Sequence, residues 1–244
     1  MAKRKSKTKT TLVQRLGVTM LAPVRRLWRW AWRVALIVTL TVSGTVAVHS
    51  VVDPPKSLYM SQEANRLNGI DFQWVPIADV NPAMGRSLVA AEDANFCLHW
   101  GFDMSAIRTA LEDGTGRGAS TLTQQVVKNV YLWHGRSWWR KAMEALITPV
   151  VEAFWSKRRI IEVYLNVAEF DEGVFGIDAA SHHYFGVGPD DLSDTQAARL
   201  AAILPNPKKR SASKPTNFVR KRTKQIRDGA ATIRRDGRSA CFED

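Results

Sequence analysis

The chain has 244 residues, of which 45% are hydrophobic, enough for one medium-sized domain together with a membrane anchor. Its formal net charge of +12 suggests nucleic-acid binding, but the charge is concentrated at the two ends. Residues 1–33 contain ten basic and no acidic residues, and residues 208–244 contain twelve basic and four acidic ones. Residues 53–207 contain thirteen basic and nineteen acidic residues, which excludes a nucleic-acid-binding domain there.

Residues 34–52 form an uncharged stretch of nineteen residues, close to the roughly 20 needed to cross a bilayer as a helix. Trp28, Trp30 and Trp32 alternate with arginines just before it, as is typical of the cytoplasmic headgroup level. A cleaved signal peptide is the alternative, but the preceding basic region is long and no small-residue cleavage site follows. The sequence predicts a single-pass anchor in the cytoplasmic (inner) membrane, with the N-terminus in the cytoplasm and the main domain in the periplasm.

Helical patterns dominate the chain after the anchor, and alternating strand patterns are scarce. Apolar spacing predicts helices over residues 84–92, 103–111, 121–132, 138–155, 157–166, 177–184 and 194–204. We therefore divide the chain into five parts: a basic cytoplasmic tail (1–33), a transmembrane helix (34–52), a linker (53–74), a mainly α domain (75–207) and a basic C-terminal tail (208–244). The sequence does not predict whether the C-terminal tail is ordered.

The two cysteines, Cys97 and Cys241, are far apart in the sequence and lack the spacing of metal ligands. In an oxidising compartment they could form a disulfide, and two separate thiols are an equally good interpretation. The pattern leaves both possibilities open.

The stretch from Ser120 to Asn129 follows a glycine-rich loop and begins a helix. Ser120 and Thr121 are good N-cap residues, and Thr121 with Gln124 has the form of a capping box. An ordinary helix with a solvated polar face would show the same pattern. However, donors at a helix start, amides and an ammonium could also hold a hydroxylated, anionic ligand. The residues that share this polar face are Gln124, Gln125, Lys128 and Asn129.

Glu92 follows an apolar run, and burial in such surroundings raises the pKa of a carboxyl group, which suits proton transfer near neutral pH. Alternatively, Glu92 merely ends a helix and pairs with a nearby arginine. Arg140 and Glu144 are four residues apart, so an intrahelical ion pair explains them equally well. The segment from Tyr164 to Asn166 closes a helix before a glycine-containing loop and, taken alone, indicates ordinary capping.

In order and spacing, these blocks resemble the signatures of the peptidoglycan glycosyltransferases, glycosyltransferase family 51. The resemblance covers about residues 75–207, and the shortness of the remaining chain leads us to expect the monofunctional type. Asp171 stands where the family commonly has glycine, so we expect a local difference in that loop. The five blocks are Glu92-Asp93-x-x-Phe96-x-x-His99-x-Gly101-x-Asp103, then Gly118 to Asn129, Arg140-Lys141-x-x-Glu144, Lys157 to Asn166 with Gly173 and Gly176, and Ala197 to Pro205.

The resemblance implies a lysozyme-like helical fold that polymerises lipid II, with the growing lipid-linked glycan as donor and the 4-hydroxyl of incoming lipid II as acceptor. It implies Glu92 as the general base of an inverting transfer and Glu144 as a second essential carboxylate. The pyrophosphate leaving group needs stabilisation of its charge rather than a proton. Candidates for this role and for binding substrate are Lys128, Arg140, Lys141, Asp93, Phe96, His99, Ser120, Thr121, Gln124, Gln125, Asn129, Tyr164 and Asn166.

The sequence predicts no metal site, although a divalent cation, Mg or Mn, could screen the substrate pyrophosphate. The expected partners are lipid II, the growing glycan chain, the membrane and cell-wall synthesis proteins. Trp133, Trp138 and Trp139 lie near Arg136 and Arg140, a composition suited to the bilayer surface, and core positions are an equally good interpretation of each tryptophan.

Two other functions agree with parts of the sequence. A lysozyme-like lytic enzyme that cleaves glycan would also place a glutamate at a helix end, but it would not need the cations at Lys128, Arg140 and Lys141. A non-enzymatic membrane scaffold would bind through its basic tails, and it would not depend on Glu92 or Gln125.

Overall fold

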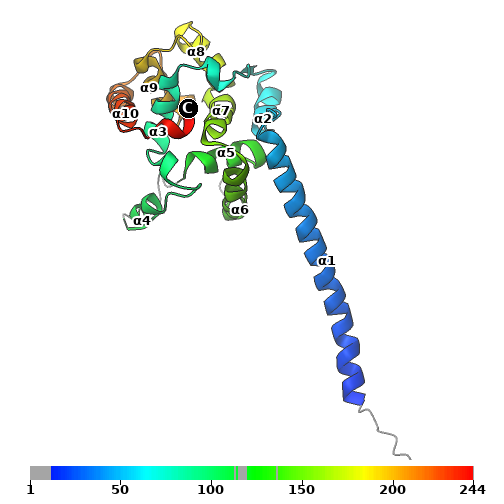
Figure 1. Cartoon of the computed structure of the whole chain (residues 1–244). Helices are drawn as coiled ribbons and strands as arrows, with labels where there is room; N and C mark the ends of the chain where they lie inside the picture. Colours follow the sequence, from blue (N-terminus) through cyan, green and yellow to red (C-terminus); the bar gives the residue numbers. More distant parts are fainter. Residues whose placement is uncertain (1–11, 113, 115–119, 136, 244) are drawn as a thin grey trace, which may run out of the picture. The chain divides into compact units, whose positions relative to one another are not determined.

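The computed structural model describes residues 12–112, 114, 120–135 and 137–243, with side chains from residue 25 onward. The chain separates into two compact units, residues 1–45 and residues 46–244. Within the described residues the protein is mostly helical, which confirms the predicted mainly α class (Figure 1).

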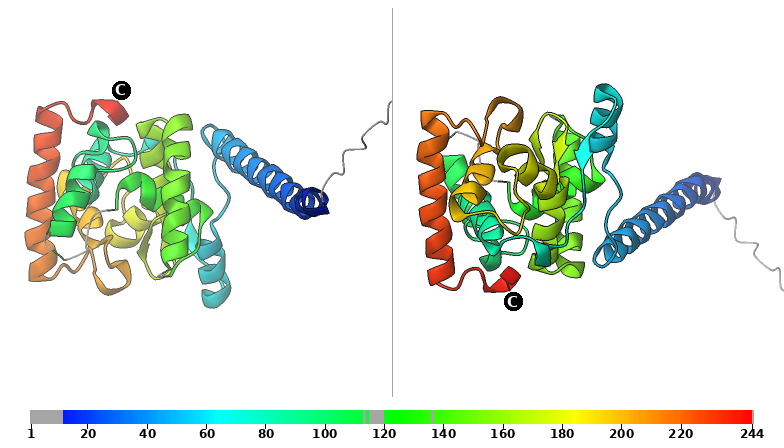
Figure 2. Two further views of the ribbon diagram at one scale, coloured as in Figure 1. Left: turned by 90° about the horizontal axis from the view of Figure 1, so that it is seen from below. Right: turned by 90° about the horizontal axis from the view of Figure 1, so that it is seen from above.

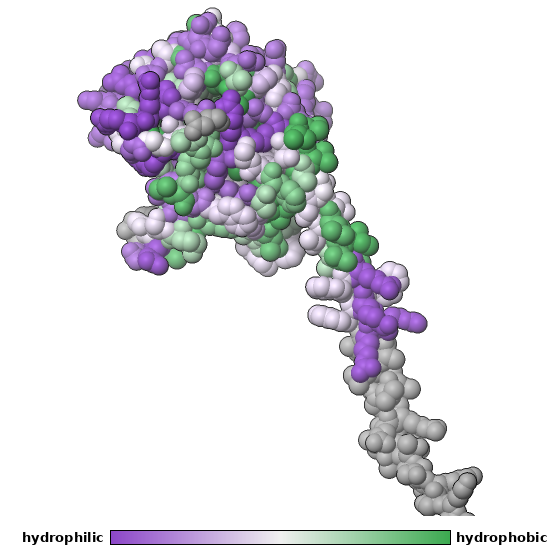
Figure 3. All heavy atoms as spheres, viewed as in Figure 1, coloured by the Kyte–Doolittle hydropathy of each residue, from purple (hydrophilic) through white to green (hydrophobic). Residues whose placement is uncertain are grey.

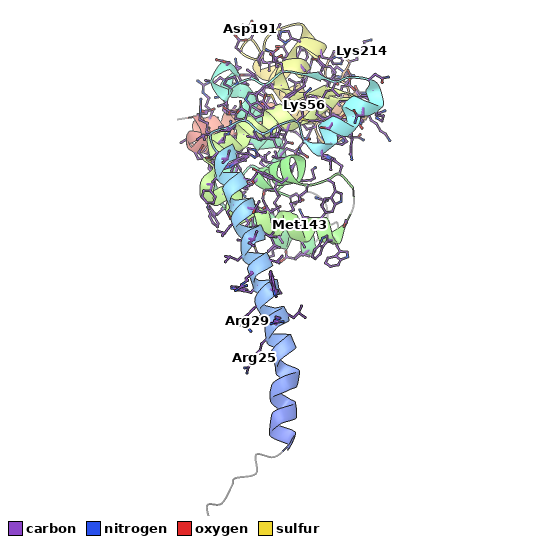
Figure 4. All side chains as sticks on the ribbon, turned by 90° about the vertical axis from the view of Figure 1, so that its right-hand side faces the viewer. Arg25, Arg29, Lys56, Met143, Asp191 and Lys214 are labelled. Atoms are coloured by element: carbon purple, nitrogen blue, oxygen red, sulfur yellow. A yellow bond between two sulfur atoms is a disulfide. The ribbon has the colours of Figure 1, made fainter. Side chains whose placement is uncertain are left out.

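The first unit is built on α1 (Leu12–His49), a helix of 38 residues that extends further toward the N-terminus than predicted. Its portion Arg25–His49 is long and apolar enough to cross a membrane. Arg25 and Arg29 project from this helix in Figure 4. The large apolar side chains beyond them are exposed, which suits lipid better than water. These exposed residues include Val34, Leu36, Ile37, Val38 and Leu40.

The second unit contains most of the remaining elements. Its helices are α2 (Leu58–Leu67), α3 (Pro82–Glu92), α4 (Met104–Glu112), α5 (Leu122–Tyr131), α6 (Trp138–Phe154), α7 (Lys157–Val167), α8 (Gly176–Phe185), α9 (Asp194–Ile203), α10 (Asn217–Arg235) and α11 (Ala240–Glu243). Three short 3-10 helices cover Ile77–Asp79, Phe96–Leu98 and Pro207–Lys209.

Two groups of helices form the core of this unit. In the first, α3 packs with α9 and α10, and Leu88, Leu200 and Ile226 are buried between them. In the second, α5 packs against α6 and α7, and Val126 of α5 and Ile161 of α7 are fully buried. The helices of both groups are amphipathic. Each buries its stripe of apolar side chains against its neighbours, which explains how the helices are packed.

A small three-stranded sheet has the order β1-β3-β2, and its strands contact α8. β1 (Asp71–Phe72) pairs parallel to β3 (Val174–Phe175), and β2 (Glu169–Asp171) pairs antiparallel to β3. The turn between β2 and β3 uses Gly173, whose φ of 75° favours glycine. Asp171 lies in the extended strand, where glycine is not needed, and its carboxylate accepts a 2.9 Å hydrogen bond from Tyr184.

The C-terminal segment 208–244 is largely ordered, a point the sequence left undecided. Figure 2 shows α10 as the long orange-red helix along one side of this unit. Val219, Ile226 and Ile233 are buried, while most of its basic residues are exposed. The three buried residues recur at helical spacing, so they form an apolar stripe that packs this very basic helix against the domain. Cys97 and Cys241 form a disulfide, which decides between the two interpretations of the cysteines.

Candidate functional site

The site begins at the C-terminal end of α3, where Glu92 is the last helical residue and Asp93 is the C-cap. Asp93 is buried, and its two carboxylate oxygens have separate partners. Oδ2 accepts a 3.0 Å hydrogen bond from the backbone N–H of Leu122, and Oδ1 lies 2.8 Å from Nε2 of His99. Asp93 thus joins the end of α3 to the start of α5, which fixes the direction in which Glu92 leaves its helix.

Glu92 is half-buried and contacts α5 through Gln125. Nε2 of Gln125 donates a 2.9 Å hydrogen bond to Oε2 of Glu92, and Oε1 of Gln125 accepts a 3.1 Å hydrogen bond from the Tyr164 hydroxyl. Tyr164 therefore orients the amide so that its NH₂ group faces the carboxylate. Burial raises the pKa of Glu92, against the opposing effects of Gln125, Arg222 and Lys128.

A second charged cluster lies at the start of α6, where Ser137 caps the helix. Glu144 is buried, with a side chain only 4% exposed, and it pairs with two cations of the preceding turn. Nη1 of Arg140 lies 2.7 Å from Oε2 of Glu144, and Nζ of Lys141 contacts the other oxygen. Lys141 also donates a 2.9 Å hydrogen bond to Oγ of Ser120. The cluster is a net cationic one, in which the carboxylate fixes the positions of both cations.

Lys128 on α5 interacts electrostatically with Glu92 and with the cluster around Glu144. Its pKa is lowered by burial, while the carboxylates of Glu144 and Glu92 raise it, and the charges of Arg140 and Lys141 lower it further. Among the described residues Lys128 forms no ion pair. A half-buried ammonium without a paired carboxylate is well suited to an anionic ligand.

The hydrogen bond between Glu92 and Gln125 joins residues that line two different hollows. One, of about 280 Å³, is lined by Glu92, Asp93 and residues at the start of α5. The other, of about 270 Å³, is lined by Gln125, Lys128 and residues of α2, α7 and the segment after α9. Ser120 and Thr121 line the first, and Asn129 and Tyr164 line the second. Eight of the residues selected from the sequence, with Gln125 and Lys128 among them, therefore line these two hollows.

Other residues selected from the sequence support this arrangement from within. Phe96 is fully buried, with the Lys157 ammonium 4.3 Å from its ring centroid. Asn166 is also buried, and its amide exchanges hydrogen bonds of 2.9 and 2.8 Å with the backbone of Val75. Neither side chain lines the two hollows. These residues hold α7 and the segments before α3 and α4 in place.

The predicted capping box at the start of α5 is confirmed. Gln124 and Thr121 bond each other's backbone N–H groups, and the Thr121 hydroxyl donates a 2.7 Å hydrogen bond to the carbonyl of Gly101. Both side chains are buried, so Gln124 serves the helix start rather than the hollow. The adjoining glycine-rich residues 115–119, and Arg136, lie outside the described residues.

The structure adds residues that the sequence analysis did not select. Glu152 is buried beneath α5, where it accepts a 2.6 Å hydrogen bond from Thr123 and pairs at 2.9 Å with Lys157. His134 stacks on Tyr59, with 3.8 Å between ring centroids, and desolvation together with the charges of Lys128, Arg140 and Lys208 lowers its pKa to about 4. These contacts join separate parts of the chain, and no local motif indicates them.

Asp93, His99 and Asp103 bring their ligand atoms within 4.8 Å of one another, which raises the possibility of a metal site. Their oxygens already have protein partners, however. Asp103 caps α4 by accepting from the backbone of Ser105 and Ala106, and both Asp93 oxygens are engaged as described. We therefore assign no cation to this group.

Apolar side chains are exposed on α4 and α6. Trp138 is 79% exposed and Trp139 is 58% exposed, so a core position is wrong for both. Leu111 of α4 and Leu146 of α6 are exposed as well. Figure 3 shows apolar surface over this part of the domain, and a surface of this kind is typical of contact with a membrane or another protein.

Comparisons with known proteins agree with this site. A family model described as transglycosylase matches residues 60–231. A biosynthetic peptidoglycan transglycosylase of Jannaschia sp. (strain CCS1) is 52% identical over 242 residues, covering 99% of each chain. One of Caulobacter vibrioides is 45% identical over 224 residues, covering 89% of this chain and 97% of the relative. The chain therefore belongs to the transglycosylase family. It is a glycosyltransferase with a lysozyme-like helical domain.

Proposed function

We propose that this enzyme polymerises lipid II into the glycan strands of peptidoglycan. The growing chain, linked to lipid pyrophosphate, would be transferred to the 4-hydroxyl of an incoming lipid II molecule. The observation that carries this proposal is the pairing of a carboxylate, Glu92, with a separate cationic cluster formed by Lys128, Arg140 and Lys141. Two hollows, linked by the hydrogen bond between Glu92 and Gln125, suit a reaction between two sugar substrates.

Glu92 is the proposed general base. Gln125 engages its Oε2, and within the described chain its Oε1 accepts no hydrogen bond. Oε1 can take the proton of the 4-hydroxyl as that oxygen attacks C1 of the donor sugar. Attack on the face opposite the pyrophosphate inverts the configuration and gives a β-linkage. Burial raises the pKa of Glu92, which makes its carboxylate a stronger base than a fully hydrated one.

The cationic cluster stabilises the departing pyrophosphate. Its negative charge grows as the C1–oxygen bond breaks, and Lys128 and Arg140 supply fixed positive charge at that moment. Arg140 is suited to bidentate phosphate contact. Glu144 acts through these cations: its buried carboxylate holds Arg140 and Lys141 in place before substrate binds. A divalent cation, if one takes part, would come with the substrate.

The anchor places this chemistry at the membrane. We propose that α1 crosses the inner membrane with residue 1 on the cytoplasmic side, so that the domain lies in the periplasm. Tethering raises the effective concentration of the domain at a substrate that itself stays in the bilayer. The exposed Trp138 and Trp139 are proposed to rest on the membrane surface. Cell-wall synthesis proteins remain proposed partners.

The alternative is a lytic enzyme that cleaves finished glycan. The cluster around Glu144 argues against it, because such a substrate carries no pyrophosphate to stabilise. Labelled lipid II in detergent or vesicles distinguishes the two. We expect the purified full-length protein to convert it into glycan polymer. Release of fragments from finished peptidoglycan, with no polymer formed from lipid II, would contradict the proposal.

A further inference from the structure

Residues 94–97, which follow the proposed base Glu92, are bonded to residues near the C-terminus. We call residues 236–243 the C-terminal clasp; they follow α10 and lie beyond the part that the family model matches. Nη1 of Arg238 donates a 3.0 Å hydrogen bond to the carbonyl of Ala94. Three residues further on, Cys97 forms its disulfide with Cys241, across a sequence separation of 144 residues. The clasp thus contacts residues 94–97 at two points.

The clasp is itself firmly attached elsewhere. Phe242 is buried, and its ring packs on α3, where a Cβ on Gly85 would be in ordinary van der Waals contact with it at 3.5 Å. Glu243 pairs at 2.7 Å with Arg86 of α3, and Arg158 of α7 donates a 3.2 Å hydrogen bond to the carbonyl of Phe242. Through the clasp, segment 94–97 is therefore connected to α3 and α7.

The guanidinium that reaches Ala94 is also held in place. Nε of Arg238 donates a 2.8 Å hydrogen bond to the carboxylate of Asp236, two residues earlier. This internal pair restricts Arg238 before it contacts Ala94, so the contact costs less side-chain entropy than one made by a free arginine.

Segment 94–97 connects the residues that shape the catalytic carboxylate. It begins after Glu92 and Asp93 and leads to His99, which contacts Asp93 at 2.8 Å. The backbone N–H of Phe96 also donates a 3.0 Å hydrogen bond to the carbonyl of Asp93. A shift of this segment would therefore move Asp93, and with it the end of α3 that carries Glu92.

We propose that the C-terminal clasp, acting through Arg238 and the Cys97–Cys241 disulfide, is a positioning element that keeps Glu92 in its productive place. This inference rests on the proposed role of Glu92 as base. No residue of the clasp lines either hollow, and the segment it holds contributes Ala94 and Asn95 to the first one, so the clasp affects turnover through the geometry of that segment. Misplacement of a catalytic group by a fraction of an ångström to 1 Å is enough to cost about tenfold to a hundredfold in rate.

The test compares the oxidised full-length enzyme with Arg238→Gln and with the double variant Cys97→Ser/Cys241→Ser, all assayed on lipid II below their unfolding temperatures. We expect kcat to fall about tenfold in each variant, with a smaller change in KM for lipid II, because no residue of the clasp itself lines either hollow. Arg238→Lys should recover part of the loss. Arg210→Gln is the matched control, because Arg210 makes a similar 3.1 Å contact with the carbonyl of Ala202 on α9, away from Glu92.

The pH profile separates positioning from stability. Besides Gln125, the charged and titratable groups that face Glu92 are Asp93, Lys128, Arg222 and Tyr164. Loosening the clasp should admit water to Glu92 and lower its raised pKa, so the acid limb of kcat should move to lower pH. A merely destabilised enzyme, like the control, should keep its acid limb. An unchanged kcat and acid limb in the disulfide-free variant would overturn the proposal.

Hydrogen exchange gives a readout that does not depend on activity. Without the disulfide, amides in residues 88–99 should exchange faster, while those of α9 should not change. Unchanged exchange in residues 88–99 would overturn the positioning role even if lipid II proves not to be the substrate. Failure of the wild-type enzyme to polymerise lipid II, with exchange altered as expected, would instead count against the proposed function alone.

Discussion

Gln125 donates a hydrogen bond of 2.9 Å from Nε2 to Oε2 of Glu92. This contact joins the helix that carries the proposed base to the helix that carries the polar face, and each of its two residues lines one of the hollows. Because the amide donates to the carboxylate, it stabilises the charged form of Glu92 and opposes the effect of burial on its pKa. The balance of these two effects sets the pH at which Glu92 becomes a base.

Replacing Gln125 with leucine should raise the pKa of Glu92. A base must be deprotonated, so activity is lost as pH falls through this pKa, and a higher pKa moves the acid limb to higher pH. A hydrogen bond to a charged group contributes about 1.5–3 kcal/mol, which corresponds to about one to two pH units. The kcat–pH profile measures the shift. An acid limb at the wild-type position would show that this contact does not control Glu92.

Lys128→Arg tests the other end of the pH range. The pKa of Lys128 is lowered by burial, so its charge should be lost at a lower pH than that of an exposed lysine, and activity should fall there. Arginine keeps its charge, so the alkaline limb should move to higher pH even where the maximal rate is reduced. If the two enzymes share the same alkaline limb, the charge of Lys128 is not the group that titrates.

Glu144→Gln should leave Arg140 and Lys141 without their carboxylate. Removing one partner of a buried pair lowers the free energy of unfolding by roughly 3 kcal/mol. Separately, kcat/KM should fall strongly, because the two cations lose their positions. Urea unfolding and lipid II kinetics measure these effects separately. The matched control is Glu172→Gln, because Glu172 pairs with Arg66 at the same 2.7 Å but is exposed. Its effect should be about 0–1 kcal/mol, and equal losses would contradict the importance of burial at Glu144.

Gly101→Ala should destabilise the fold beneath the site. Gly101 has φ of 82°, and a Cβ there would lie 2.6 Å from Cγ2 of Thr148. Backbone strain of about 1 kcal/mol and overpacking of about 1–3 kcal/mol should therefore add. Gly186→Ala is the control, because its φ of 67° imposes similar strain in open space. Equal free energies of unfolding for the two variants would contradict the steric argument.

Local signals predicted the parts of the site that depend on one helix. The capping box of Thr121 and Gln124 and the i,i+4 pair of Arg140 and Glu144 follow from spacing alone, and both are present. Sequence patterns could not show which polar residues face inward. Asn166 has the type of a substrate-binding residue, yet its amide is engaged by Val75, a contact over 91 residues that no local pattern reveals.

Long-range contacts account for the remaining differences. The basic composition of residues 208–244 concealed the apolar stripe of α10, so the order of this segment was not predicted. Arg222 donates a 2.9 Å hydrogen bond to the carbonyl of Ala91, beside Glu92, but in the sequence it is one of many cations in a basic run. Only the packing of α10 on α3 distinguishes Arg222 from its neighbours.

The most direct measurement of the central claim is polymerisation of labelled lipid II by the wild-type enzyme and by Glu92→Gln, with circular dichroism to confirm that both are folded. Glutamine keeps the size of the side chain and removes the base. The account predicts polymer from the wild-type enzyme and a loss of about a hundredfold or more in the variant. Polymerisation by Glu92→Gln at the wild-type rate would contradict it.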